Sequence, residues 1–94
     1  MGSLPTKKTI TALVNDLANP QILYASSSDG VFKSPDAGAS WQTMNTGLRE
    51  TQIVAVAINP AQPAHLYAVS ASGQIFRSTD GAATWQRQGQ LPTG

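Results

Sequence analysis

The stretch FKSPDAGASWQ, residues 32–42, returns 44 positions later as FRSTDGAATWQ, residues 76–86. The match extends upstream to Ile10 and its copy Ile53, and fifteen of the 33 aligned positions are identical. One extra residue, Gln74, changes the offset from 43 to 44. A period of this length is typical of one four-stranded propeller blade, although helical repeats of similar length exist. The chain therefore consists of two copies of one repeat unit.

The pattern inside each repeat favours strands over helices. Each copy opens with an apolar stretch, ITALV at 10–14 or IVAVAI at 53–58. A proline-containing turn follows, and proline does not continue a helix. The next two short runs are rich in residues that favour strands and are joined by a glycine turn, as in a hairpin. The Trp-Gln pair begins a fourth strand, so the sequence predicts an all-β fold of two four-stranded antiparallel sheets.

Composition excludes several classes of protein. The 94 residues carry six basic and five acidic side chains and no cysteine, so disulfides and thiolate metal sites are absent. The basic residues are scattered, whereas a nucleic-acid surface gathers them on one face. The longest apolar run, 53–58, is too short to span a bilayer, and no apolar signal segment opens the chain. We expect a soluble protein with no nucleic-acid or membrane partner, and the sequence names no cellular location.

The repeated stretch resembles the Asp box, or BNR repeat, whose pattern is Ser/Thr-x-Asp-x-Gly-x-Thr/Ser-Trp. Residues 34–41 fit this pattern at every defined position, and residues 78–85 fit except that Ala82 replaces the usual glycine. Asp boxes occur in sialidases, xyloglucanase-type glycoside hydrolases, sortilin-like receptors and photosystem assembly factors. What these proteins share is a β-propeller and not an activity. The resemblance therefore implies two propeller blades.

The residues of the Asp box suit a structural role. A short carboxylate or hydroxyl in a turn caps backbone N–H groups that lack a strand partner. Glycine in the box supplies a positive φ at low cost, so Ala82 should distort or shift the second turn. A buried tryptophan should fix each turn onto the blade beneath it. The predicted structural residues are Ser34, Asp36, Gly38, Trp41, Ser78, Asp80 and Trp85.

Catalytic and metal-binding interpretations of Asp36 and Asp80 are weaker. A glycosidase needs two carboxylates about 5–9.5 Å apart, whereas equivalent positions on successive blades point around the periphery of a ring. A calcium loop needs more acidic ligands than either box carries. The arginine cluster and Tyr/Glu pair that the sialidase resemblance implies cannot be assembled here. We therefore expect no catalytic residue, metal or cofactor, and assign structural or solvent roles to Asp16, Asp29, Glu50, Tyr24, Tyr67 and His65.

Two blades alone leave apolar faces uncovered. The stretch IVAVAI at 53–58 is apolar on both faces, which is typical of a sheet covered on both sides. The expected division is a cloning remnant at residues 1–3, one blade at 4–47 and a second at 48–94. Head-to-tail contacts between copies close into a ring when the rotation fits, and propellers usually have about 4–8 blades. We expect rings of three or four chains, with five possible by analogy with sortilin-like propellers.

The ends of the chain also repeat. Gly-x-Leu-Pro-Thr at residues 2–6 returns at residues 89–93, displaced by 43 + 44 = 87 residues. This favours one cassette of a tandem array, either excised or engineered. The predicted function is a non-catalytic propeller cassette that self-assembles and has at most a protein- or glycan-binding role. Residues 43–52 are the longest candidate contact loop, although the simpler interpretation of this segment is an ordinary linker between blades. The alternative is a fragment of an Asp-box glycoside hydrolase whose catalytic residues lie in absent blades.

Overall fold

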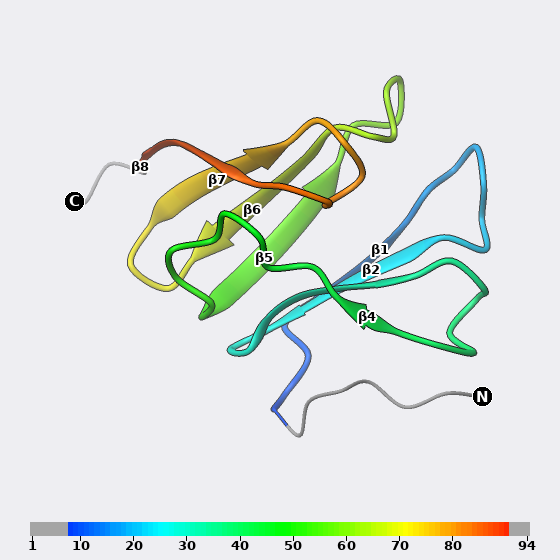
Figure 1. Cartoon of the computed structure of the whole chain (residues 1–94), viewed down its shortest axis with the longest axis horizontal. Coiled ribbons are helices and arrows are strands. Elements are labelled where there is room, and N and C mark those ends of the chain that lie inside the picture. The colour runs from blue at the N-terminus through cyan, green and yellow to red at the C-terminus, as the bar shows by residue number, and fades with distance from the viewer. Residues whose placement is uncertain (1–7, 91–94) are drawn as a thin grey trace.

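The computed structural model describes residues 8–90, which form two antiparallel four-stranded sheets (Figure 1). Each sheet is a meander, in the order β1-β2-β3-β4 and β5-β6-β7-β8. The predicted all-β fold is confirmed, whereas the expected remnant at 1–3 and the terminal repeat at 2–6 and 91–93 lie outside the described residues. The strands are β1 (Ala12–Asn15), β2 (Leu23–Ser27), β3 (Gly30–Ser34), β4 (Gln42–Thr43), β5 (Ile53–Ile58), β6 (Leu66–Ser70), β7 (Gln74–Ser78) and β8 (Gln86–Gln90).

The two central strands of each repeat pair in the same register. Ala25 of β2 faces Phe32 of β3, and their copies Ala68 and Phe76 face each other in the second sheet. The turn after β1 is closed by the Asp16 carboxylate, which accepts the backbone N–H groups of residues 18 and 19 at 2.8 and 3.1 Å. The turn role expected for Asp16 is confirmed.

The two repeats differ in their outermost strands. The strand β4 has two residues because the Asn45 side chain takes over its pairing: Oδ1 accepts the Val31 N–H at 2.8 Å, and Nδ2 donates to the Asp29 carbonyl at 2.9 Å. Gly89 stands at the equivalent place in the second repeat, where β8 continues to Gln90. The chain thus leaves the first sheet early and turns through residues 44–52 towards β5.

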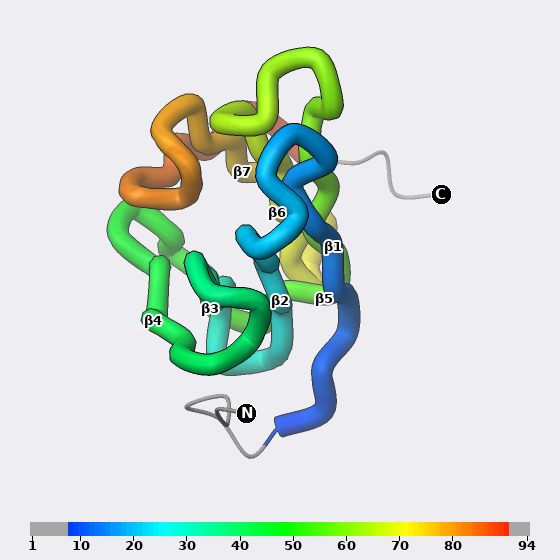
Figure 2. The backbone as a smooth tube through the Cα atoms, turned by 90° about the vertical axis from the view of Figure 1, so that its right-hand side faces the viewer, coloured from blue at the N-terminus to red at the C-terminus, as the bar shows by residue number. Residues whose placement is uncertain are grey.

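The hydrophobic core lies between the two sheets. Tyr24 and Val31 of the first sheet pack in one buried cluster with Val56, Phe76 and Trp85 of the second repeat. Figure 2 shows β1 beside β5 along one side of the molecule, and the β7–β8 turn beside the segment that joins β4 to β5. One face of each sheet is therefore covered by the other sheet.

The remaining faces are partly open. In β5, Ile53 and Val56 are buried, whereas Val54 is 46% exposed and Ala57 is also exposed. Within residues 8–90 no helix is long and apolar enough to cross a membrane. The apolar pattern of β5 predicts cover on both sides, but the second side of this sheet has no neighbour among the described residues.

Candidate functional site: the Asp-box turns and the blade junction

The first Asp box is a closed network of hydrogen bonds. The Ser34 hydroxyl donates to Asp36 Oδ1 at 2.9 Å and accepts the Gly38 N–H at 2.8 Å. The Asp36 carboxylate also accepts the backbone N–H and the hydroxyl of Ser40 at 2.8 and 2.7 Å. The Ala37 N–H donates to the carbonyl of residue 21 at 2.7 Å, which ties the box to the β1–β2 turn. Every polar group thus stabilises the turn between β3 and β4.

The second Asp box repeats this network despite its alanine. The Ser78 hydroxyl donates to Asp80 Oδ1 at 2.8 Å and accepts the Ala82 N–H at 2.9 Å. Ala82 has a φ of 73° where Gly38 has 93°, so the alanine adopts the left-handed conformation and keeps the turn in place. The expectation that Ala82 would shift the turn is wrong. The cost is backbone strain of about 1–2 kcal/mol.

The hydrogen bonds set the charge state of both carboxylates. The hydroxyl and backbone N–H of Thr84, followed by the Ser78 hydroxyl, lower the pKa of Asp80 to about 2. The hydroxyl and then the backbone N–H of Ser40 also lower the pKa of Asp36. Both groups are ionised acceptors at neutral pH. A general acid needs a raised pKa, so the environment of these groups opposes that role.

Acid is expected to weaken the fold through these carboxylates. The pKa of Asp80 is about 2 in the folded chain, below the value of about 3.9 for an unfolded aspartate. The stabilisation is therefore complete above the unfolded value and is lost as the pH falls from about 5 to 2. Urea unfolding across this range should show a shallower loss of stability for Asp80→Asn than for the wild type. An equal loss in both proteins would contradict this assignment.

The second tryptophan joins the two repeats. Trp85 is 3% exposed, and its indole Nε1 donates to the carbonyl of Met44 at 2.9 Å. Its backbone N–H donates to the carbonyl of Thr46 at 2.8 Å. The equivalent Trp41 is only half-buried, because no sheet precedes the first repeat among the described residues. The expectation of a buried tryptophan therefore holds for Trp85 within the chain, and for Trp41 it stays a prediction that depends on a neighbouring blade.

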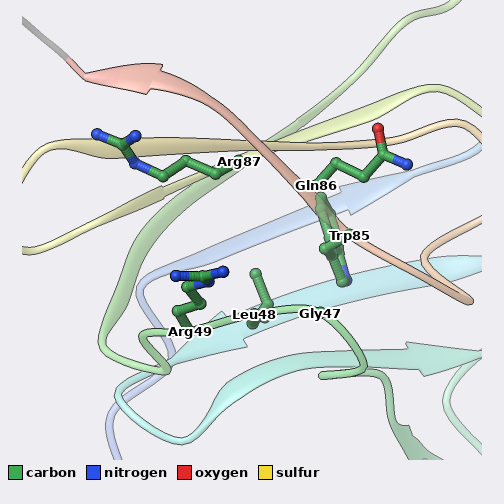
Figure 3. Close-up of a pocket in the computed structure, with 6 residues that line it drawn as sticks. All are labelled: Gly47, Leu48, Arg49, Trp85, Gln86 and Arg87. Atoms are coloured by element: carbon green, nitrogen blue, oxygen red, sulfur yellow. The ribbon is translucent and has the colours of Figure 1, made fainter.

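A cavity of about 630 Å³ opens beside this junction. Figure 3 shows Trp85 and Gln86 on one side of it, with the side chains of Arg49 and Arg87 extending on the other. Arg49 belongs to the loop 43–52 that the sequence predicts as a contact surface. No sequence signal identified Arg87, because an isolated arginine after the Asp box matches no motif.

The other residues weighed for chemistry lie apart from this cavity. Tyr24 is 2% exposed, and burial together with the Asp16 charge raises its pKa. Tyr67 and His65 lie beside Arg77, whose Nη2 is 3.3 Å from His65 Nδ1 and whose guanidinium lies 6.0 Å from the Tyr67 ring centre. His65 is thus half-buried and not a fully solvated loop residue as expected. In the part of the chain that the structure describes, no three acidic or histidine side chains gather in a metal-binding arrangement.

Several known structures contain the same arrangement of strands. An ancestral GH74 enzyme superposes with a TM-score of 0.78 at 20% identity, over 94% of this chain and 13% of its own. YCF48 from Cyanidioschyzon merolae gives a TM-score of 0.74 at 19% identity, over 97% and 30%. The GH74 xyloglucanase from Xanthomonas campestris gives 0.76 at 18% identity, over 99% and 18%. The chain thus spans less than a third of each, and these likenesses show the fold alone.

Two meandering sheets, each closed by an Asp-box turn and packed face to face, define a pair of β-propeller blades. A search of curated protein sequences found no match. A family model does match, over residues 1–94. The chain belongs to the family of the DUF6242 beta propeller domain. The resemblance to Asp-box propellers stated from the sequence is confirmed, and we call the sheet β1–β4 blade 1 and the sheet β5–β8 blade 2.

Proposed function

We propose that this chain is a non-catalytic propeller cassette that docks head-to-tail on copies of itself to complete a ring. The observation that carries the proposal is the unequal burial of equivalent residues. Tyr24 in blade 1 is 2% exposed, whereas its copy Tyr67 in blade 2 is 39% exposed. In the other direction, Val56 in blade 2 is 6% exposed, whereas its equivalent Leu13 in blade 1 is 61% exposed. At these two positions each blade therefore exposes a side chain that is covered in its twin.

The contact between blade 1 and blade 2 inside the chain indicates which surface can bind to each open face. Blade 2 presents Val56 and Trp85 to blade 1, which receives them with Tyr24 and the carbonyl of Met44. Blade 1 offers the same kind of surface through Leu13 and its half-buried tryptophan. Since one chain carries both halves of this contact, a second copy supplies the complementary face. Contacts of this head-to-tail kind close into rings or continue as filaments.

The chemistry of the Asp boxes supports a non-catalytic role. Asp36 and Asp80 are each held by their own turn, and both have a lowered pKa. A protein or glycan ligand is expected to bind at loops of the ring, where the cavity beside Trp85 offers the guanidinium groups of Arg49 and Arg87. Arginine and tryptophan are both enriched where proteins bind their partners.

The solution mass tests the proposal. Size-exclusion chromatography with light scattering over a range of concentrations should give a multiple of 9.8 kDa, three or four chains in the expected rings. A monomer at every concentration would contradict self-assembly. Release of reducing sugar from xyloglucan by the assembled protein would contradict the non-catalytic role and support the glycoside hydrolase fragment instead.

A further inference from the structure

We propose that Tyr67 and Arg77 form a socket for the Asp-box turn of the next copy, with Ala37 as the residue that enters it. This inference rests on the proposed self-assembly and specifies its contact. Tyr67 and Arg77 lie on neighbouring strands, paired as Tyr67 opposite Arg77. Both side chains lie on the face of blade 2 that points away from blade 1, where Tyr67 is 39% exposed.

The junction inside the chain provides the template. There, Gly81 of the second Asp box lies against blade 1. A Cβ placed on Gly81 would be 3.4 Å from Lys33 Nζ and 3.6 Å from the Tyr24 hydroxyl. Lys33 in turn lies over the Tyr24 ring, with Nζ 5.6 Å from its centre. A cation stacked on a tyrosine thus receives the tip of the Asp-box turn.

The corresponding parts of a second contact have no partner within residues 8–90. They are the Tyr67–Arg77 pair in blade 2 and the Asp-box turn at Ala37 in blade 1. Arg77 lies over the ring of Tyr67 as Lys33 lies over Tyr24. Ala37 occupies the place of Gly81, has a similar φ of 60° against 69°, and is exposed. A methyl group fits at this place with small adjustments, because the distances around Gly81 are those of close van der Waals contact. Ala37 can therefore enter the Tyr67–Arg77 socket as Gly81 enters its own.

Arg77 is incompletely bonded in the single chain. Its Nε is buried without a hydrogen-bond partner in the described part of the chain, while Nη2 contacts His65 Nδ1. A buried donor without an acceptor destabilises the folded chain. The buried Nε is already covered within the chain, so the docked turn would present its backbone carbonyls to the outer nitrogens of the guanidinium. Arginine and lysine both donate hydrogen bonds to such acceptors, and Lys33 stands at the equivalent place of the internal junction.

Charge-swap variants test the socket. Ala37→Lys places a second cation against Arg77, and Arg77→Glu places an anion against the Asp36 turn, so each should weaken assembly at least about hundredfold. The double variant Ala37→Lys/Arg77→Glu pairs the new charges and should return to within about tenfold of the wild type. Arg77→Lys copies Lys33 of the internal junction and is the matched control, with assembly close to that of the wild type.

The readout is the dissociation constant of assembly from light scattering across concentration, with circular dichroism confirming that each variant is folded. Ala37 is exposed, so Ala37→Lys tests the contact even if Arg77→Glu perturbs blade 2. A wild type that assembles while both single variants assemble equally well would overturn the socket and leave self-assembly standing. A double variant no better than either single one would also overturn it. A monomeric wild type would overturn both proposals.

Discussion

Replacing Trp85 with alanine is expected to lower the free energy of unfolding by about 3–5 kcal/mol, as other buried tryptophan truncations do. The side chain is 3% exposed and fills the core between the blades. Its removal also leaves the Met44 carbonyl without its indole donor. Because a domain of this size has a stability of about 5–15 kcal/mol in total, a large share would be lost.

Trp41→Ala is the matched control for this prediction. Its side chain occupies the same place in the repeat but is half-buried, so the loss of stability in the monomer should be clearly smaller. Urea unfolding followed by circular dichroism, at concentrations low enough to keep the chain monomeric, measures both variants. Equal losses for Trp41→Ala and Trp85→Ala would contradict the unequal burial on which the assembly proposal depends.

Replacing Gly47 with alanine is expected to destabilise the chain by at least about 2 kcal/mol. Gly47 has a φ of 91°, where an L-residue carries a strain of about 1–2 kcal/mol. The added Cβ would also overlap the backbone carbonyl of Trp85. Since a backbone atom cannot rotate away as a flexible side chain can, the loop or β8 must shift and loosen the blade junction.

Gly89→Ala is the control for that change. Gly89 lies in β8, and a Cβ there would meet no other atom within 4 Å. Its thermal unfolding midpoint should stay near that of the wild type, while that of Gly47→Ala falls by several degrees. A similar midpoint for both variants would show that the contact between Gly47 and Trp85 is not needed for the junction.

The sequence predicted the fold because the Asp box is a local motif. The bonds among Ser78, Asp80 and Thr84 span at most four residues, so the same short pattern gives the same turn in both repeats. The spacing between the boxes then fixed four strands per blade. What the pattern did not predict is the short β4, because the Asn45 side chain replaces strand pairing through bonds to residues 14 and 16 positions earlier.

Tertiary contacts account for the other differences. Ala82 keeps its positive φ because its N–H is bonded to Ser78 and its side chain is fully buried in the core. Local propensity alone predicted a shifted turn. The burial of Trp85 but not Trp41 depends on which neighbour each has, and the cavity that includes Arg87 depends on how blade 2 meets the loop after β4. Neither can be deduced from one repeat by itself.

The most direct test of self-assembly is iodide quenching of tryptophan fluorescence across protein concentration. The chain has two tryptophans, and Trp85 is already covered within the chain. In a dissociated sample Trp41 should be quenched and Trp85 protected. As copies assemble, docking should cover Trp41 and protect both. If one accessible tryptophan remains at every concentration up to the highest attainable, the open face of blade 1 is not covered by another copy, and the proposal is contradicted.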